Sequence, residues 1–520
     1  MKAQDYKISS EKFVFRSQDE RLHDKKLETK PVSYFRDAFN RFAKNKGSIV
    51  ATFIIGIIIL FAIIAPFCSP YEVADEDKHY AFAMPRNNFF YERGIEFWDG
   101  GKEFEVNKLT YDRFLAMEEE IGRTVIMSEP TITETTNILK KTRKMYTFRL
   151  DTYSSVGAEF VLVTLEEYQR LQRYQDIFGV QVILPITDYW QRPEAEQDKE
   201  DADIWYQTRK GAGGKTEIVY ADKKNEEGFI NIYVPYNPDV DPYDSVMRWE
   251  GDEPLYNYSR KMQGDQYEIR VDYYEYYQYI HYLKNDGITE PQFILGANDA
   301  GKDIFICLAS GARFSLILAV VVASVNLFVG AIYGAIEGYY GGKIDLLMER
   351  FVEILGSIPF MIVITLLKYH FSVSHMLILF ISFFLTGWTG MAGRTRMQFY
   401  RYKNQEYVLV SRTLGANDRR VMFKHIFPNA IGTLITSSVL VIPGVIFSET
   451  SLSYLGIIDL STGSMTSIGT LLAKGQNHLF TYPHLILFPA IFISLLMLSF
   501  NLFGNGLRDA FNPSLRGTEE

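Results

Sequence analysis

The residues with the clearest chemical potential in this chain form a basic segment, residues 394–428. It holds eight lysines or arginines against two acids, Glu406 and Asp418. Guanidinium and ammonium groups at this density bind acidic protein surfaces through charge-assisted hydrogen bonds. An excess of lysine and arginine between apolar segments also marks the cytoplasmic side of a membrane protein. We therefore expect a docking loop for a cytoplasmic partner, and no catalytic or metal site.

The local sequence predicts two short helices within this segment. No residue from 406 to 414 breaks a helix, and Gly415 supplies the left-handed conformation that ends one. Asn417 or Asp418 is suited to cap the next helix. Pro428 disfavours helical geometry in the residue before it, so we expect the second helix to end near Phe427.

Six apolar stretches surround this segment, each near the roughly 20 residues that a helix needs to cross a bilayer. We predict six membrane-spanning helices, with prolines 359, 443 and 489 accommodated by neighbouring helices. The stretches are residues 48–65, 314–336, 351–367, 376–393, 430–447 and 484–503.

The charge pattern orients these helices in the lipid bilayer. Residues 1–46 carry twelve lysines or arginines against seven acids, so this segment and the basic loop are both expected inside. Six spans then place the C-terminus inside as well. Phe35, Phe39 and Phe42 share one helical face, which predicts an interfacial helix before the first span.

Residues 72–295 form a strongly acidic insert between the first two spans. They contain 43 acidic and 26 basic residues, a net charge of −17, whereas the whole chain carries −9, which leaves +8 elsewhere. The two populations are expected to face different solvents, with the insert outside. Its acidity argues against nucleic-acid binding.

The insert is long enough for a core of its own and shows an α+β pattern. A capping box of Thr164 and Glu167 begins a helix that Gly179 ends. Strands are predicted at residues 146–150, 159–163, 180–184, 229–234 and 267–273, and a mobile loop at 190–228. Residues 211–216 resemble a phosphate loop but lack its first glycine, so a hairpin is expected there.

Tyrosines gather near the end of the insert, at Tyr273, Tyr274, Tyr276, Tyr277 and Tyr279. Two interpretations stay open. They form an aromatic core, or they dock a substrate-delivery protein, because tyrosine is enriched at interfaces. Cys68 and Cys307 flank the insert, and a disulfide between them is one option in an oxidising exterior.

Several motifs in one order resemble the C-type permease (transmembrane) subunit of the dipeptide/oligopeptide ABC importer family. The basic loop matches at Arg412, Gly415, His425 and Pro428, but Leu409, Val410 and Ser411 replace the family's Glu-Ala-Ala. Lys302, Glu353 and Asn505 stand where the family commonly has arginine, aspartate and aspartate. The motifs are residues 295–303, 311–315, 338–342, Arg350 with Glu353 and Pro359, 449–456 and 501–509.

This resemblance implies a type I ABC importer permease fold in a bacterial cytoplasmic membrane. It implies a second homologous permease subunit, two cytoplasmic ATPase subunits that hold Mg-ATP, an extracellular substrate-binding (lipo)protein and a peptide substrate. No cofactor is expected in this chain. The implied ATPase-coupling residues are Ser411, Arg412, Gly415, Ala416, Asp418, Arg419, Arg420, Val421, Lys424 and Pro428. Val421 or Met422 would supply apolar contacts to the ATPase.

Glu353, Pro359 and Glu449 are candidates for the translocation path or its gate. A carboxylate near an apolar span lines the interior of a bundle or pairs with a cation. Arg350 lies three residues before Glu353, which allows a pair on one helical face. A salt bridge that only fixes helix packing is the alternative interpretation.

The alternatives to a peptide importer are a membrane-anchored receptor or sensor, an ion-coupled carrier, or a relative that imports nickel or another small solute.

These observations divide the chain into five parts. The parts are the cytoplasmic segment 1–46, the first span 47–68, the external insert 72–295, the permease core 296–513 with its coupling loop 398–428, and the tail 514–520.

Overall fold

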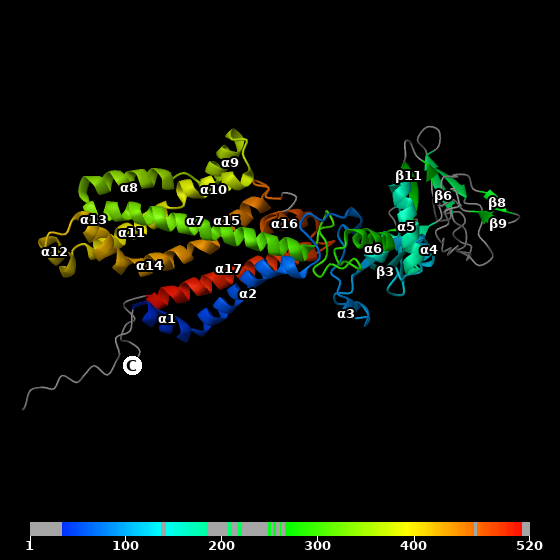
Figure 1. The fold of residues 1–520 in the computed structure, drawn as a ribbon, viewed down its shortest axis with the longest axis horizontal. Helices are drawn as coiled ribbons and strands as arrows, with labels where there is room; N and C mark the ends of the chain where they lie inside the picture. The colour runs from blue at the N-terminus through cyan, green and yellow to red at the C-terminus, as the bar shows by residue number, and fades with distance from the viewer. Residues whose placement is uncertain are drawn as a thin grey trace, which may run out of the picture.

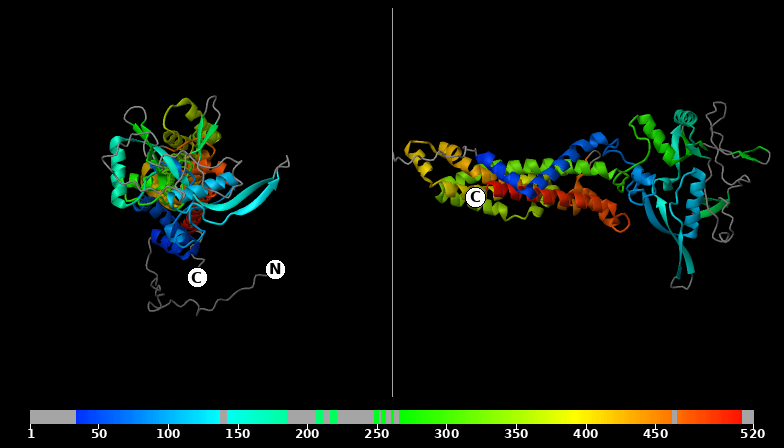
Figure 2. Two further views of the ribbon diagram at one scale, coloured as in Figure 1. Left: turned by 90° about the vertical axis from the view of Figure 1, so that its right-hand side faces the viewer. Right: turned by 90° about the horizontal axis from the view of Figure 1, so that it is seen from below.

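The chain folds into a long helical bundle with a mixed α/β unit at one end (Figure 1). The two views in Figure 2 show the same division. The computed structural model describes residues 34–136, 142–184, 206–210, 216–220, 248–250, 253–255, 260–261, 266–461 and 465–511.

Five helices of the described chain are long and apolar enough to cross a membrane, and a bent pair makes a sixth. The pair is broken by a bend of 71° between Gly356 and Phe360. The predicted third span, 351–367, is therefore two helices rather than one continuous helix. The five are Lys46–Cys68, Ile304–Tyr340, His375–Tyr402, Asp418–Tyr454 and His484–Phe511, and the pair is Gly342–Gly356 with Phe360–His370.

The bundle begins with α1, which confirms a helix before the first span. Phe42 packs its ring edge-on against Phe503 at 5.3 Å, whereas Phe39 is exposed. The helices are α1 (Tyr34–Lys44), α2 (Lys46–Cys68), α7 (Ile304–Tyr340), α8 (Gly342–Gly356), α9 (Phe360–His370), α10 (His375–Thr386), α11 (Thr389–Tyr402), α12 (Glu406–Thr413), α13 (Asp418–Arg420), a π-helix (Val421–Ile426), α14 (Phe427–Val439), α15 (Val441–Tyr454), α16 (Ile468–Gly475), the short η7 (Gln476–His478) and α17 (His484–Phe511).

Helix α7 is the longest helix of the described residues, with α2 and α15 packed beside it, and it packs most closely on α11. Glycines 330, 334 and 338 fall on one face of α7. A Cβ atom on Gly334 would lie 2.1 Å from the carbonyl oxygen of Ala392 in α11. Small residues four apart let two membrane helices approach at backbone distance, so this glycine stripe sets the α7–α11 contact.

The insert contains two main sheets with antiparallel pairing. One has the strand order β1-β3-β2, and the other has β10-β11-β4 with β5 paired to β11. Its elements are η3 (Lys78–Tyr80), α3 (Asn88–Tyr91), β1 (Gly101–Asn107), α4 (Lys108–Ile121), β2 (Thr131–Thr136), β3 (Thr142–Asp151), η4 (Ser154–Val156), β4 (Ala158–Thr164), α5 (Leu165–Phe178), β5 (Ile183–Leu184), β6 (Tyr206–Lys210), β7 (Thr216–Tyr220), β8 (Arg248–Glu250), β9 (Glu253–Leu255), β10 (Arg260–Lys261), β11 (Gln266–Asp272) and α6 (Tyr273–Lys284).

The strongest local predictions for the insert are confirmed. Thr164 and Glu167 form the capping box of α5, and Gly179 ends it with φ 66°. The predicted strands at 146–150 and 159–163 lie within β3 and β4. The strand predicted at 180–184 is only the two residues of β5, and the strand at 229–234 lies outside the described residues. Most of the predicted loop 190–228 also lies outside them, although β6 and β7 pair antiparallel around residues 211–215.

The insert is attached to the start of α17 and to the turn before it by aromatic contacts. Phe82 stacks on Tyr482 at 4.7 Å, and Trp98 stacks on Phe488 at 5.9 Å. The Lys102 ammonium lies 3.4 Å from the centre of the Tyr482 ring, and burial lowers the pKa of this lysine to about 8. The insert is thus fixed against the bundle by more than its two connecting segments.

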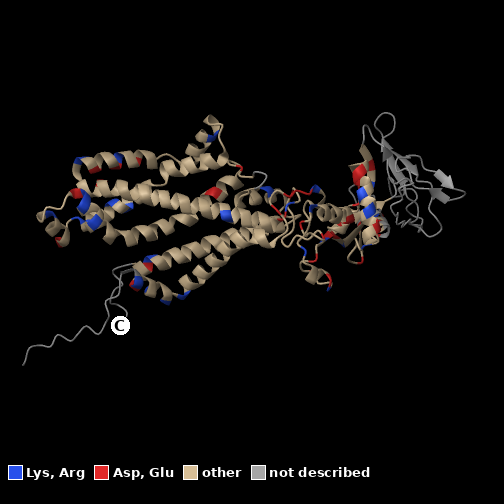
Figure 3. Cartoon of the chain, viewed as in Figure 1, with Lys and Arg blue, Asp and Glu red and all other residues tan. Residues whose placement is uncertain are grey.

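Charge separates along the long axis of the molecule. Figure 3 shows lysines and arginines gathered at the end that carries α12 and α13, few charges along the middle of the bundle, and many acids in the insert. The insert and the basic segment therefore lie at opposite ends of the bundle (Figures 1 and 3).

Candidate functional site

The basic segment folds as two helices joined by a tight turn. Helix α12 ends in paired backbone hydrogen bonds from Gly415 to the Arg412 carbonyl at 2.9 Å and from Ala416 to the Ser411 carbonyl at 3.1 Å. Gly415 has φ 81°. This is the Schellman arrangement, which needs a left-handed residue. Ser411, Gly415 and Ala416 thus build the turn.

The second helix begins as predicted but does not end at Phe427. The Asn417 side chain accepts a hydrogen bond from the Arg420 backbone N–H at 2.9 Å and caps α13. The chain then runs through the π-helix directly into α14, with Pro428 in its first turn. The backbone N–H of Phe427 donates to the Met422 carbonyl five residues earlier. The wider π turn leaves room for a proline ring that a regular helix would exclude.

The exposed side chains of this segment are both basic and apolar. Arg412, Arg419, Arg420 and Lys424 are exposed, as is Pro428. Leu414 is 82% exposed, and Val410, Leu409 and Phe423 are also exposed. A large exposed apolar group beside cations indicates a surface for a protein partner.

Val421 and Met422 do not belong to this surface. Both are buried in a cluster with Tyr339 and Phe399. The expectation that they supply apolar contacts to a partner is therefore wrong, because the π-helix turns them toward α7 and α11. The sequence did not single out Leu414 as an exposed apolar residue of this surface. It lies at the end of a short helix, where the spacing of apolar residues does not define an exposed face.

Three polar contacts join the basic segment to the end of α7. The Tyr339 hydroxyl donates a 2.6 Å hydrogen bond to Asp418, and the Arg412 guanidinium lies 5.0 Å from the centre of the Tyr339 ring. The Lys403 ammonium donates to the Gly338 carbonyl at 3.0 Å. The segment is therefore fastened to the last turn of α7.

A second polar cluster lies close to this junction and was not found from the sequence. Arg396 of α11 makes two hydrogen bonds to Asp345 of α8, at 2.6 and 3.0 Å. It also lies 3.3 Å from carboxylate oxygens of Glu349 and of the buried Glu337. One guanidinium thus joins α7, α8 and α11, through acids that lie 47 to 59 residues earlier in the chain.

The candidates for a translocation path lie apart from one another. Arg350 and Glu353 form the predicted ion pair on α8, with side chains that are largely exposed in this chain. Pro359 precedes α9 at the 71° bend. The pair therefore fixes no buried helix contact within this chain, contrary to the packing interpretation.

Glu449 is enclosed. Its carboxylate accepts hydrogen bonds from Ser315 of α7 at 2.9 Å, from Ser453 at 3.2 Å and from Thr450 at 3.5 Å. Its side chain has no solvent exposure. The hydroxyl donors come from α7 and α15, so this carboxylate ties the two helices together, and in the single chain it faces no open passage.

The tyrosine docking expectation is contradicted by burial. Tyr273, Tyr274, Tyr277 and Tyr279 are each less than a tenth exposed, and Tyr276 is partly buried. Most of them pack into the aromatic core at the base of the insert, which also includes Tyr80 and Phe293. Buried rings have no surface to offer a delivery protein, so the core interpretation holds for these four residues.

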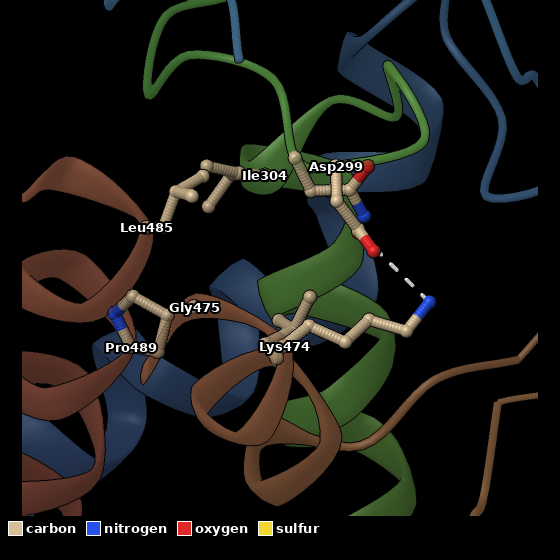
Figure 4. Close-up of a pocket in the computed structure, with 8 residues that line it drawn as sticks. Asp299, Ile304, Lys474, Gly475, Leu485 and Pro489 are labelled. Carbon is tan, nitrogen blue, oxygen red and sulfur yellow. Dashed lines mark ion pairs between the residues drawn. The ribbon is translucent and has the colours of Figure 1, made fainter. Parts of the chain in front are cut away.

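The cysteines are both free, Cys68 exposed and Cys307 buried, so the disulfide option is not realised. A small cavity of about 10 Å³ lies between α16, α17 and the start of α7, and Figure 4 shows Lys474 directed toward Asp299. Their charged atoms are 3.9 Å apart. The cavity is no larger than one water molecule and offers no room for a substrate.

Comparison with known proteins identifies two family regions. Residues 327–517 match the model described as "Binding-protein-dependent transport system inner membrane component". Residues 33–85 match "N-terminal TM domain of oligopeptide transport permease C". Residues 86–326, which include most of the insert, lie outside both matches.

Curated relatives agree with these models. The oligopeptide transport system permease protein OppC of Bacillus subtilis is 41% identical over 221 residues, which is 42% of this chain and 72% of that protein. The dipeptide transport system permease protein DppC of the same organism is 39% identical over 227 residues, 42% of this chain and 68% of that protein. DppC of Lactococcus lactis is 36% identical over 265 residues, 51% of this chain and 73% of that protein.

These relatives are transport permease subunits rather than enzymes. The matched lengths exceed two thirds of each relative, and the two family regions contain the α1–α2 start and the α8–α17 helices. The resemblance stated from the motifs is thereby confirmed. This chain belongs to the membrane-spanning permeases of binding-protein-dependent ABC importers, within the group of the oligopeptide and dipeptide C-type subunits.

Proposed function

We propose that this chain forms half of the translocation path of an ATP-driven peptide importer. In this proposal the basic segment 398–428 receives force from a cytoplasmic ATPase, and the insert 72–295 faces the exterior. The partners are a second homologous permease, two ATPase subunits with their Mg-ATP, and an external binding protein that delivers peptide. The names of the oligopeptide and dipeptide relatives support peptide as the cargo.

The observation that carries the proposal is the fastening of an exposed basic and apolar surface to α7. Arg412 and Asp418 both contact Tyr339, so a displacement of α12 and α13 pulls on the last turn of α7. The first turn of that helix adjoins the insert, because the backbone N–H of Ile304 donates a 3.0 Å hydrogen bond to the carbonyl of Gly296, the residue that follows the insert.

The mechanism follows from these contacts. ATPase closure moves α12 and α13, and the Tyr339 junction carries this displacement to α7. The glycine stripe on α7 holds α11 at backbone distance, so the two helices tilt together and the path opens outward. Hydrolysis then resets the assembly. This is a two-state element biased by a ligand at a distance.

Charge reversal tests the coupling role. Arg412→Glu places a carboxylate beside Asp418, and we expect it to reduce both ATPase retention during purification and peptide uptake. Arg170→Glu is the matched control, because Arg170 is exposed on α5 of the insert. Normal ATPase retention and normal uptake in Arg412→Glu would refute the coupling role.

Labelling from outside intact cells tests the orientation. The exposed Cys68 is first replaced by serine, which leaves only the buried Cys307, and one exposed cysteine is then introduced as Lys424→Cys or Glu166→Cys. A membrane-impermeant maleimide should label position 166 and leave position 424 unlabelled until the cells are opened. Labelling of position 424 in intact cells would overturn the proposed topology.

A further inference from the structure

A cavity of about 330 Å³ lies at the base of the insert, beside the start of α7. Three parts of the chain line it: the segment after α2, helix α6, and the residues that lead into α7. None of these residues belongs to a candidate membrane span. Its volume is within the range of small-molecule sites, whereas the cavity of Figure 4 is not.

Aromatic rings form much of the cavity wall. Tyr71, Tyr273, Tyr277 and Phe293 line it, and all four are less than a tenth exposed. They belong to one packed cluster, so their positions are fixed before any ligand arrives. Aromatic faces attract cations through their quadrupoles.

Two carboxylates complete the wall. Asp77 accepts hydrogen bonds from the Tyr273 hydroxyl at 2.8 Å and from the His79 backbone N–H at 3.0 Å. Asp303 is 5% exposed and accepts from the Phe305 backbone N–H at 3.0 Å. Among the residues that the structure describes, neither carboxylate forms an ion pair with a lysine, arginine or histidine. The carboxylate oxygens of Asp77 and Asp303 can therefore accept further hydrogen bonds from a cationic ligand.

The net charge of the lining favours a positive ligand. Glu76 is paired with Lys302 at 3.0 Å. The other lining acids are Asp75, Asp77 and Asp303, against two exposed lysines, Lys78 and Lys284. Two histidines also line the cavity, His79 and His281, and His281 is hydrogen-bonded to Asp286 at 2.6 Å. An anion would meet an excess of carboxylates here. No group of three metal-ligating side chains occurs within the described ranges, and buried rings are poor ligands for a metal ion.

We propose that this cavity binds an organic cation, a protonated primary amine attached to an apolar body. Asp77 and the ionised form of Asp303 hold the ammonium group, and the tyrosine rings enclose the rest. A free amine and the amino end of a short peptide share this chemistry. That the natural occupant is a peptide rests on the proposed function, whereas the amine site itself does not.

Binding to the purified full-length chain in mild detergent tests the proposal without any ATPase. Three probes are titrated by calorimetry: the dipeptide Phe-Ala, its N-acetylated form, and phenethylamine. We expect Phe-Ala and phenethylamine to bind and the N-acetylated dipeptide not to bind. Equal binding of the acetylated and free dipeptides, or no binding of either amine, would refute the amine site.

The three titrations distinguish a free amine from the amino end of a peptide as the ligand. Binding of both amines supports a site that accepts a peptide amino end. Binding of phenethylamine without Phe-Ala supports the amine chemistry and rejects peptide as the occupant, and it leaves the import function to be judged from uptake assays. Loss of uptake in the complete importer with intact amine binding would count against the import proposal alone.

Two variants locate the binding. Asp77→Asn keeps an acceptor for Tyr273 but removes the charge, and it should weaken amine binding by about tenfold or more, as for loss of a charge-assisted hydrogen bond. Glu166→Gln removes an exposed charge of the same domain outside the cavity and should bind normally. Ile280→Trp fills the cavity from α6 without altering charge and should also abolish binding, so it decides the outcome if Asp77→Asn does not fold. Unaltered binding in a folded Ile280→Trp would place the amine elsewhere and refute the proposal.

Discussion

Tyr339, in the last turn of α7, donates a 2.6 Å hydrogen bond to Asp418, the first residue of α13. Helix α7 has 37 residues, so it is about 55 Å long at the α-helical rise. Its other end is capped by Asp303, which lines the cavity at the base of the insert. One continuous helix thus joins the basic segment to the proposed amine site.

Removing the Tyr339 hydroxyl should weaken this link. We expect Tyr339→Phe to cost about 1 kcal/mol or less in stability, the usual net value of one hydrogen bond, but to lower the peptide transported per ATP hydrolysed in proteoliposomes. Tyr340→Phe is the control, since this neighbour is 48% exposed. Equal transport per ATP in wild type, Tyr339→Phe and Tyr340→Phe would show that the hydrogen bond carries no coupling.

A side chain at Gly415 should strain the backbone, although space is open around this residue. A Cβ atom there would meet nothing within 4 Å, but φ is +81°. Gly415→Ala should therefore cost about 1 kcal/mol through backbone strain alone, and amide hydrogen exchange across 406–420 should accelerate. Gly390→Ala is the control, because its surroundings are equally open and it lies in a helix with ordinary φ. Alanine replacement there should be neutral or stabilising.

The stability of the chain should depend on the protonation of Asp303. Burial raises the pKa of this carboxyl to about 7, from an ordinary value of about 4. Between these values the folded protein retains a proton that the unfolded chain has released. Raising the pH across this window therefore lowers the free energy of unfolding, and the loss levels off above pH about 7.

Asp303→Asn tests this dependence. Asparagine still caps α7 but does not titrate, so thermal midpoints between pH 5 and 8 should vary less than in wild type, and the variant should be the more stable protein at pH 8. Parallel wild-type and Asp303→Asn curves would assign the pH dependence to other groups.

Glu449 should stabilise the fold by accepting hydrogen bonds from the hydroxyl groups around it. Glu449→Ala leaves Ser315 and Ser453 without their acceptor, and each unsatisfied buried group costs about 1 to 3 kcal/mol. We expect a lower thermal midpoint for Glu449→Ala and a largely restored one for Glu449→Gln. Uptake should follow the amount of folded protein in both variants. A stable Glu449→Gln protein that does not transport would instead assign the carboxylate to the path.

Local interactions explain what was predicted correctly from the sequence. The capping box of Thr164 and Glu167 and the Gly415 turn depend on residues within about one or two helical turns of one another. The apolar stretches and the basic loop depend on the composition of one continuous segment each. The Arg350–Glu353 pair follows from helical spacing in the same way. The family motifs added the assignment to an importer, because their order is preserved across the membrane half.

Only the tertiary structure decided the features that join distant residues. Pro428 is compatible with a continuing helix because the π turn before it widens the backbone, and Val421 is buried because that turn faces Phe399 and Tyr339. Arg396 meets Asp345 across 51 residues, and three tyrosines of α6 are buried by segments from both ends of the insert. The sequence by itself determined which segments are apolar, charged or helical, since those properties are local. Which side chains are left exposed, paired or enclosed around a cavity depended on three-dimensional packing between segments far apart in the chain.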